Sequence, residues 1–212
     1  DAVLDVGCGW GGMLRAAAAT RAEGVPRLAH GVGLTLSDAQ ADVARGAIAQ
    51  DMPNFGSPSP RFDIRLESWV DHKPAEPYGA IVSIGAFEHF TKPEDEPAAK
   101  IAIYRDFFSR CRDWLRPDGR MTLQTIAYGD PNLDAAAIPF MRDIFPDSDL
   151  PRIRDVLTAT DGLFEVERIR NDRVDYARTC DIWANNLRTH RAEAVALVGA
   201  EQTRRYERYL KF

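Results

Sequence analysis

Short apolar runs alternate with longer segments of helical periodicity along most of this chain. The apolar runs predict strands at residues 2–6, 30–34, 62–66, 80–84, 121–125 and 164–170. The periodic segments predict helices at residues 13–22, 38–50, 101–115 and 153–160. Strands that alternate with helices are typical of a parallel sheet covered by helices. We therefore predict an α/β fold with a Rossmann-like, doubly wound and mostly parallel sheet.

Residues 179–212 differ from the rest because their pattern is largely helical, with a break predicted near Gly199. Residues 52–60 are rich in Pro, Ser, Asn and Gly, which predicts a loop. The acidic run from Glu94 to Glu96 stands between two prolines and is typical of a solvated surface. The chain of 212 residues has the size of one large α/β domain, so we expect residues 1–212 to form a single domain.

Charge and cysteine content limit the classes of partner. The net charge of −5 argues against a nucleic-acid partner, because such proteins normally carry a strongly basic surface. The three cysteines are too few and too scattered for a disulfide framework or a zinc site. The chain has no apolar run near the ~20 residues that a membrane helix needs. We expect a cytoplasmic protein with a lipid-like or small-molecule partner, no metal and no transmembrane anchor; peripheral membrane contact and the oligomeric state stay open.

The clearest motif is a glycine-rich loop, VLDVGCGWGG at residues 3–12, which leads from a predicted strand into a predicted helix. Its glycines allow a sharp turn and a close approach to a ligand, and the helix N-terminus offers N–H groups to an anion. In a methyltransferase that anion would be the methionine carboxylate, with Asp5 organising the site through hydrogen bonds. Two other interpretations are open. Gly7, Gly9 and Gly12 also satisfy the dinucleotide motif G-x-G-x-x-G, and a glycine loop can be a tight turn without a ligand.

The end of the second predicted strand separates the first two interpretations. A nicotinamide enzyme places an acidic residue there to hold the ribose hydroxyls. Thr35, Leu36 and Ser37 follow the strand in this chain, which favours the methyltransferase interpretation. Three glycines at this spacing before a helix also make the ligand-free turn the less favoured reading.

Further motifs in the same order are similar to those of the cyclopropane fatty acid synthase and mycolic acid methyltransferase family. Besides the glycine loop, they are GLTLS at residues 33–37 with Gln40, IVSIGAFEHF at 81–90, WLRPDGR at 114–120, IFP at 144–146, and YART at 176–179 with Trp183. Together they cover nearly the whole chain. The resemblance implies the class I methyltransferase fold, S-adenosylmethionine as methyl donor and a lipid-like alkene as the usual acceptor.

The resemblance also implies a set of site residues. The residues expected to hold the cofactor are Asp5, Gly7, Cys8, Gly9, Gly11, Thr35, Leu36, Gln40, Ser68, Trp69 and Ile84. The expected catalytic residues are Glu88, Tyr176 and Gln124. Ser68 and Trp69 fall where the family covers the adenine, although Trp69 is also open to interpretation as an ordinary core aromatic.

A base must remove a proton once the methyl group has reached a carbon acceptor. Family members are similar in holding a bicarbonate ion as this base, and Glu88 and Tyr176 match two of its ligands. Gln124, however, occupies the position of a histidine ligand, and glutamine forms hydrogen bonds without carrying a charge. Bicarbonate binding and ring closure are therefore in doubt, and simple methylation is favoured at least as much as cyclopropanation.

The family's N-terminal helices and last strand have no counterpart in residues 1–212, so we interpret the chain as a truncated catalytic core. We predict a C-methyltransferase of the cyclopropane fatty acid synthase type that acts on an alkene carbon of an unsaturated acyl chain or a similar acceptor, with or without ring closure. The alternative is an N-, O- or C-methyltransferase of a small specialised metabolite. A binding module without activity is disfavoured, because neither the glycine loop nor Glu88 is eroded.

Overall fold

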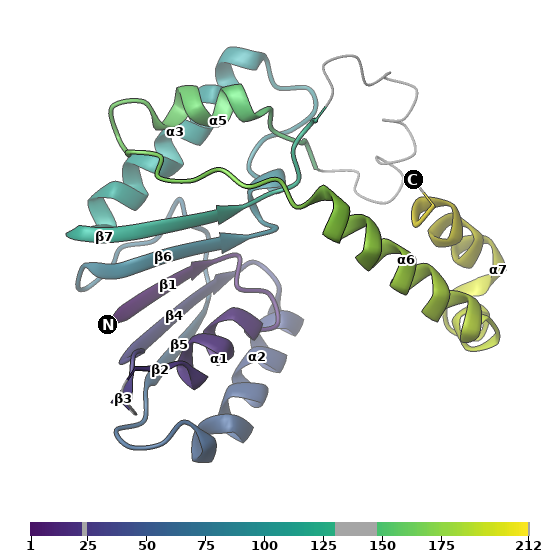
Figure 1. Ribbon diagram of the computed structural model, residues 1–212, viewed down its shortest axis with the longest axis horizontal. Coiled ribbons are helices and arrows are strands. Elements are labelled where there is room, and N and C mark those ends of the chain that lie inside the picture. The colour runs from purple at the N-terminus through teal and green to yellow at the C-terminus, as the bar shows by residue number, and fades with distance from the viewer. Residues whose placement is uncertain (23–24, 130–147, 212) are drawn as a thin grey trace. The chain divides into compact units, whose positions relative to one another are not determined.

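The structure, a computed structural model, describes residues 1–22, 25–129 and 148–211 (Figure 1). The strands are β1 (Ala2–Val6), β2 (Arg21–Ala22), β3 (Val25–Pro26), β4 (His30–Thr35), β5 (Arg61–Leu66), β6 (Tyr78–Ile84) and β7 (Leu115–Gln124). The α-helices are α1 (Gly12–Ala19), α2 (Asp38–Asp51), α3 (Pro97–Trp114), α5 (Ile153–Thr160), α6 (Arg173–Thr189) and α7 (Arg191–Tyr209), and the short 3-10 helices are η1 (Met52–Asn54) and η2 (Phe87–His89).

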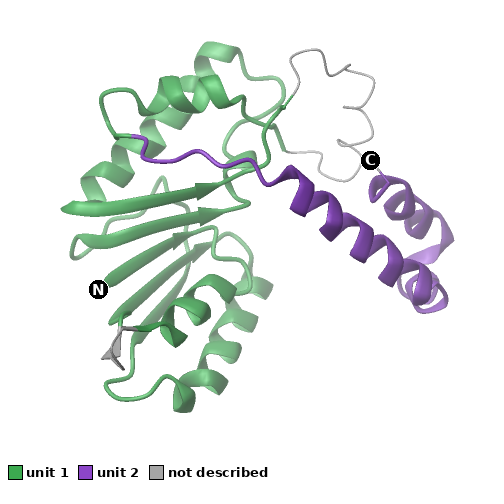
Figure 2. Ribbon diagram, viewed as in Figure 1, with its two compact units in different colours: residues 1–133, 147–165 green, residues 134–146, 166–212 purple. Residues whose placement is uncertain are grey.

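The chain divides into two compact units, which Figure 2 shows in different colours. The first, residues 1–133 and 147–165, contains the sheet and the helices up to α5. The second, residues 134–146 and 166–212, contains α6 and α7, which pack against each other. That residues 1–212 act as a single domain stays an expectation.

Within the described residues, five strands form one parallel sheet in the order β5-β4-β1-β6-β7. The α/β fold with a doubly wound parallel sheet is therefore confirmed. The chain moves outward from β1 to β4 and β5, then crosses back to β6 on the other side of β1. The buried hydroxyl of Ser83 donates to the Val6 carbonyl at 3.0 Å and joins β6 to β1 at this reversal. Open α/β sheets bind ligands at such a reversal, beyond the carboxyl ends of the strands.

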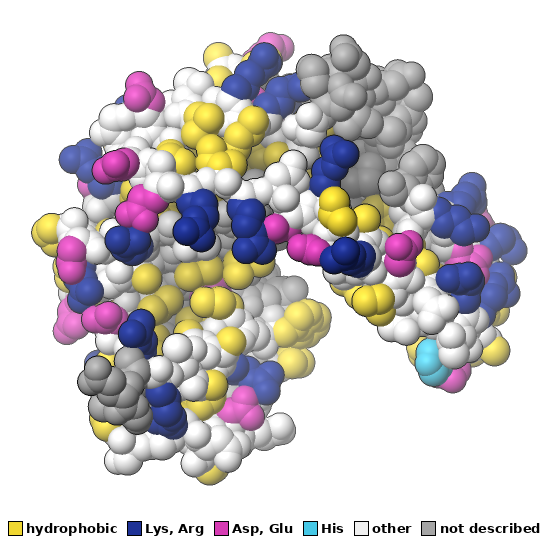
Figure 3. Space-filling view, in the orientation of Figure 1, with side chains coloured by type: hydrophobic (Ala, Val, Ile, Leu, Met, Phe, Trp, Pro, Cys, Tyr) yellow, Lys and Arg dark blue, Asp and Glu magenta, His cyan; other side chains and the backbone are white. Residues whose placement is uncertain are grey.

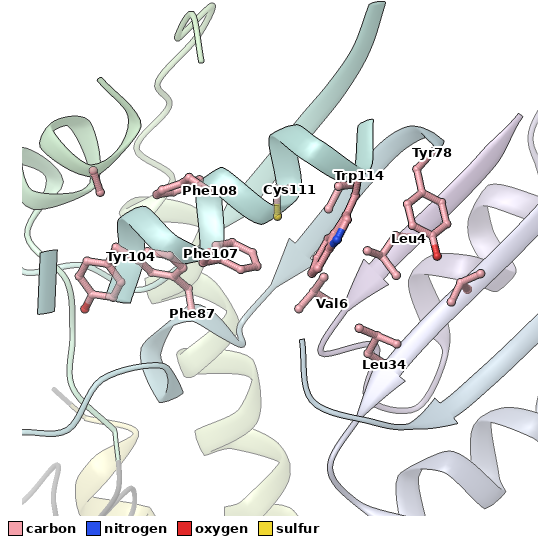
Figure 4. Packing of buried hydrophobic residues seen from close by; sticks show 13 residues of the cluster. Leu4, Val6, Leu34, Tyr78, Phe87, Tyr104, Phe107, Phe108, Cys111 and Trp114 are labelled. Carbon is pink, nitrogen blue, oxygen red and sulfur yellow. The ribbon is translucent and has the colours of Figure 1, made fainter. Parts of the chain in front are cut away.

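The two faces of the sheet carry separate cores. Leu4 and Val6 of β1 pack with the aromatic side chains of α3, including Phe107 and Phe108, and Figure 4 shows this cluster from close by. Val3 points to the opposite face, where Leu14 of α1 and the alanines and isoleucine of α2 pack. Successive side chains of a strand point to opposite faces, so Asp5 shares the face of Val3 and the glycine loop. Replacing the fully buried Phe107 by alanine would cost about 3–5 kcal/mol of stability.

The helix limits differ from the predicted ones where local signals compete with periodicity. Helix α1 ends at Ala19, because Thr20 is extended and Arg21–Ala22 pairs with Val25–Pro26 in a small hairpin. Helix α3 begins at Pro97, since proline is well tolerated in the first turn, where its missing N–H has no helical partner. Helix α5 has the predicted limits.

The predicted strand at residues 164–170 is wrong. These residues have no regular secondary structure, and Val166 and Ile169 are both largely exposed. A segment with apolar residues becomes a strand only when a neighbouring strand accepts and donates the backbone hydrogen bonds. None of the described strands pairs with this segment.

The predicted break near Gly199 is confirmed, because this residue interrupts α7 with a φ of 82° and a ψ of 160°. The helical pattern also extends further than predicted, since α6 begins at Arg173, and His190 separates α6 from α7. On the face of the first unit in Figure 3, acidic and basic side chains are interspersed, in keeping with the modest net charge of the chain.

Candidate active site

The glycine loop after β1 is tied to the neighbouring strand by its backbone. The N–H groups of Gly7 and Cys8 both donate to the Leu34 carbonyl of β4, at 3.0 and 2.8 Å. Gly7 has a φ of 78°, and a β-carbon on it would lie 2.3 Å from the β-carbon of Ala86. A side chain at this position would therefore separate the loop from the turn after β6, and only glycine allows the two to meet.

Gly9 is different from Gly7 because its surroundings are open. Its φ is 52°, and a β-carbon added to it would meet no heavy atom within 4 Å. The loop thus presents bare backbone to solvent at Gly9, as the close approach of a ligand requires. A β-carbon on Gly11, by contrast, would press on Ala44 of α2 at 3.0 Å, so this glycine lets the loop pack on α2.

The Cys8 side chain points away from the open side of the loop. It is buried with α1, α2 and Ile64, and its sulfur is close enough to β4 that a β-carbon on Gly33 would lie 2.8 Å from it. Burial raises the pKa of the thiol to about 12, and the nearby Asp5 carboxylate adds to the effect, so the thiol stays protonated. Membership of Cys8 in the cofactor site stays a prediction, and the geometry limits it to the backbone.

Asp5 is a buried carboxylate immediately before the loop. None of the hydrogen bonds between described residues is donated to the Asp5 side chain. Burial raises its pKa from 3.8 to about 7. A buried acid without an internal donor is costly, and such groups are frequent at sites where a ligand supplies the missing partner.

The turn after β4 is rigid and ends in an exposed leucine. The Thr35 hydroxyl donates to the Gln40 side-chain oxygen at 2.9 Å, and the Gln40 N–H donates to the Ser37 hydroxyl at 3.3 Å. Ser37 is therefore the N-cap of α2. Between these polar residues, Leu36 is 77% exposed, although leucine is normally buried. Ile84, the last residue of β6, is 46% exposed at the same edge of the sheet.

Ser68 and Trp69 lie in the turn after β5. The Trp69 ring packs against Phe90 and Phe107, each at a centroid distance of 5.2 Å, and Arg110 of α3 lies over it at 5.8 Å. The core interpretation of Trp69 thus has direct support, while a contact with adenine stays a prediction. The partly exposed ring also borders a shallow apolar hollow with Phe90 and Ile103. Because this hollow lies over α3 and not over the glycine loop, we do not assign it to the cofactor.

Glu88 is the most unusual side chain of the site. It lies in η2, directly after β6, and is only 4% exposed. One carboxylate oxygen accepts the backbone N–H of Ile126, just beyond β7, at 2.5 Å. The other oxygen is buried without a hydrogen-bond partner. Its backbone carbonyl accepts the Asp149 N–H at 2.9 Å, so the residue is held on both sides while one oxygen remains unused.

Phe87 explains why Glu88 is held so firmly. Its ring is fully buried and stacks on Tyr104 at a centroid distance of 4.4 Å, and Figure 4 shows the two side by side beneath α3.

Gln124 is the last residue of β7, and its carbonyl accepts the Gly85 N–H at 3.1 Å. The Gln124 side chain is exposed over Gly85. Gln124 and Glu88 are thus brought to the same edge of the sheet, where the parallel strands β6 and β7 end, although they are 36 positions apart in the sequence.

Two of the expected features lie elsewhere. Tyr176 lies on α6 in the second unit, partly exposed, with its ring edge-on to Trp183 at 6.3 Å. Its role beside Glu88 therefore stays a prediction. The IFP motif at residues 144–146 lies outside the described residues. The Ile126 N–H was not predicted, because a backbone donor is set by strand geometry and leaves no signal in residue identity.

The family comparison agrees with this geometry. The family model for mycolic acid cyclopropane synthetase matches residues 1–212. The chain belongs to this family. It is therefore an S-adenosylmethionine-dependent methyltransferase, and the nicotinamide interpretation is excluded.

Individual relatives support the assignment over almost the full chain. The chain is 34% identical to cyclopropane mycolic acid synthase 2 of Mycobacterium tuberculosis over 99% of its own length and 68% of the relative. It is 33% identical to the S-adenosylmethionine-dependent methyltransferase UmaA of Mycobacterium tuberculosis, over 98% of the chain and 70% of the relative. The crystal structure of mycolic acid cyclopropane synthase CmaA1 complexed with SAH and CTAB is similar with a TM-score of 0.78 and 33% identity, over 99% of the chain and 70% of that structure.

The described residues contain no helix with the length and apolar character needed to cross a membrane. A group of His, Cys, Asp and Glu side chains suited to a metal ion is likewise not found among them. The cytoplasmic location and the individual site residues stay predictions.

Proposed function

We propose that this chain transfers the methyl group of S-adenosylmethionine to an alkene carbon of an unsaturated acyl chain or a similar lipid-like acceptor. The observation that carries the proposal is Glu88, a buried carboxylate that is fixed by one oxygen and free at the other. S-adenosylmethionine supplies an electrophilic methyl group on a positively charged sulfur. The residues of the chain must then hold the donor, receive the acceptor and remove one proton.

The glycine loop and its neighbours are suited to the donor. Gly9 offers open backbone, and Asp5 needs a hydrogen-bond donor that the described residues do not supply. We assign this missing donor to the amino group of the methionine part, whose positive charge also favours the ionised form of Asp5. Thr35 and Gln40 present a fixed pair of polar groups for the ribose, with the exposed Leu36 beside them. We assign Ser68 and Trp69 to one side of the adenine and the exposed apolar side chain of Ile84 to the other.

Glu88 is suited to the proton. Methyl transfer to an alkene leaves a positive charge on the acceptor, which is discharged when an adjacent C–H bond gives up its proton. A base must be positioned and shielded from water for this step. The unused Glu88 oxygen meets both requirements, because the other oxygen is anchored and the side chain is almost fully buried.

The same oxygen bears on the bicarbonate question. An unpartnered carboxylate oxygen fits the O–H of a bicarbonate ion, and the Gln124 amide fits one of its other oxygens. Glu88 and Gln124 together therefore fit a weakly held bicarbonate, because Gln124 adds a hydrogen bond but no charge. Glu88 also suffices as the base without the ion. We accordingly favour methylation without an obligatory ring closure.

The second candidate is methylation of a nitrogen, oxygen or carbon atom of a small specialised metabolite. The exposed and uncharged Gln124 favours it, because an amide can orient a polar acceptor at the site. Such an acceptor needs only a simple base, which Glu88 provides directly.

The deciding experiment is incubation of the full-length protein with methyl-labelled S-adenosylmethionine and vesicles of an unsaturated phospholipid. Mass spectrometry of the released acyl chains should show the labelled methyl carbon in the chain, and the Glu88→Gln variant is the control. Resistance of the product to hydrogenation distinguishes a ring from a double bond. Label-free acyl chains from a protein that binds the cofactor would overturn the lipid proposal and favour the small-metabolite alternative.

A further inference from the structure

A buried polar network closes the turn that carries Ser68 and Trp69. His72 is fully buried just after this turn. Its Nδ1 lies 3.0 Å from Oε1 of Glu67, and its Nε2 lies 3.0 Å from the hydroxyl of Tyr78. Both ring nitrogens are therefore used, and they join the segment just after β5, at Glu67, to the start of β6, at Tyr78.

The partners limit the direction of the two hydrogen bonds. A carboxylate only accepts, so Nδ1 of His72 donates to Glu67. When the imidazole is neutral, this leaves Nε2 as the acceptor for the Tyr78 hydroxyl. Burial raises the pKa of Tyr78 to about 12, so its hydroxyl carries a proton to donate. In this tautomer the hydrogen bonds run from Tyr78 to His72 and from His72 to Glu67.

Packing fixes the position of the imidazole as well. Its ring lies edge-on to Trp114 at a centroid distance of 5.0 Å and stacked with Tyr78 at 6.0 Å. Figure 4 shows Tyr78 and Trp114 together at one end of the core cluster, above Leu4. An apolar ring of the same size would fill this space equally well. The polar atoms of His72 are therefore not required to fill the core, and a buried polar group tends to fix one geometry at a cost in desolvation.

What the network fixes is the turn between Glu67 and His72. The backbone N–H of His72 donates to the Trp69 carbonyl at 3.4 Å, and the backbone N–H of Asp71 donates to the Ser68 carbonyl at 3.1 Å. On the other side, Arg110 of α3 donates to the Val70 carbonyl at 2.9 Å. Arg110 and the packing of Trp69 on Phe90 and Phe107 hold the middle of the turn. The network holds its end, at His72.

We propose that His72 is a positioning residue for the adenine end of the cofactor site, acting through the turn that presents Ser68 and Trp69. The Glu67–His72–Tyr78 network sets the affinity for the adenosine part of the cofactor. The proposal rests on the proposed function, because it takes Ser68 and Trp69 as the residues that cover the adenine.

The test compares two ligands by calorimetry: S-adenosylhomocysteine and methylthioadenosine, which has the adenosine part and lacks the amino-acid part. His72→Phe keeps the ring beside Trp114 and removes both hydrogen bonds. We expect it to weaken both ligands by the same factor, about 5- to 20-fold, because the lost contact acts on the part they share. Glu67→Gln keeps an acceptor for Nδ1, so it should weaken both ligands less than His72→Phe does.

The matched control is Phe55→Leu, a core change in a different cluster, which should lower the melting temperature without changing either affinity. If His72→Phe does not fold, Tyr78→Phe removes a single oxygen and should show a smaller shift of the same kind. Unchanged affinities in either folded variant would overturn the proposal, as would weakening of S-adenosylhomocysteine alone, or equal weakening by Phe55→Leu. Failure of the unaltered protein to bind S-adenosylhomocysteine would instead overturn the proposed function.

Discussion

Gly7 and Gly9 take the chain from β1 towards α1 through backbone conformations that L side chains rarely adopt, whereas β6 ends in Gly85, which also has a positive φ, and is followed by the right-handed helix η2. The glycine loop depends on the absence of a side chain at Gly7, because a β-carbon there would collide with Ala86. The turn after β6 is instead anchored by a large side chain, the buried ring of Phe87. One region is shaped to let a ligand approach the backbone, and the other is shaped to hold one side chain still.

Both regions nevertheless contain a buried carboxylate that the described residues leave incompletely paired. Asp5 has no internal donor, and Glu88 has a donor to one oxygen only. The unfavourable burial is therefore concentrated at the edge of the sheet where the two regions meet, whereas the Thr35 and Gln40 side chains are hydrogen-bonded to each other. Because Asp5 has no internal donor while Glu88 is anchored by one oxygen, we assign binding to Asp5 and proton transfer to Glu88. Substitutions can test whether the two roles are distinct.

The largest effect is expected for Gly7→Ala. The new methyl group would lie 2.3 Å from the Ala86 β-carbon in a backbone conformation that alanine avoids. We expect a loss of about 3 kcal/mol or more in unfolding free energy and no measurable S-adenosylhomocysteine binding. Gly46→Ala, in the interior of α2 with no neighbour within 4 Å, is the matched control and should stabilise by about 0.5–1 kcal/mol. Denaturant titration and calorimetry measure both; retained binding by Gly7→Ala would contradict the steric explanation.

Glu88→Gln comes next and should affect the reaction without affecting the fold. The amide oxygen still accepts the Ile126 N–H, but the side chain can no longer take up a proton. We expect kcat to fall by about 100-fold or more, because general bases contribute roughly that much. The affinity for S-adenosylhomocysteine should change less than twofold, by about 0.4 kcal/mol at most. Equal losses of kcat and cofactor affinity would show that Glu88 belongs to the binding region.

Asp5→Asn comes last, and the size of its effect on stability depends on pH. Because burial raises the Asp5 pKa from 3.8 to about 7, the folded protein retains a proton that the unfolded chain releases. Stability from this residue is thus intact below about pH 4 and decreases as the pH rises to about 7. Without cofactor, Asp5→Asn should be more stable than the parent by up to about 4 kcal/mol at pH 8 and nearly equal to it at pH 4.

The same Asp5→Asn variant should bind S-adenosylmethionine less tightly, because it loses the charge that we assign to the methionine amino group. Unfolding curves at the two pH values and a titration with the cofactor give both results. A variant that gains stability and keeps full affinity would show that Asp5 is a buried acid without a role in binding.

The motifs of the chain predicted the order of elements well where several signals coincide. The first strand, the glycine loop and α5 lie where expected, and the helical pattern after residue 172 breaks at Gly199 because glycine carries little helical preference. Residues 164–170 show the limit. Their apolar residues suggested a strand, but strand pairing depends on a neighbour that the local sequence does not contain.

For the site, residue identity determined which groups are available: the glycines, Asp5, Glu88 and the uncharged Gln124. Only the tertiary structure decided how they are used. It turned the Cys8 side chain into the core, gave Glu88 the Ile126 N–H for one oxygen and left the other without a partner, and joined His72 to Glu67 and Tyr78. The physical reason is that local preferences act over a few residues, whereas burial and hydrogen bonding are settled by which strands and helices come together.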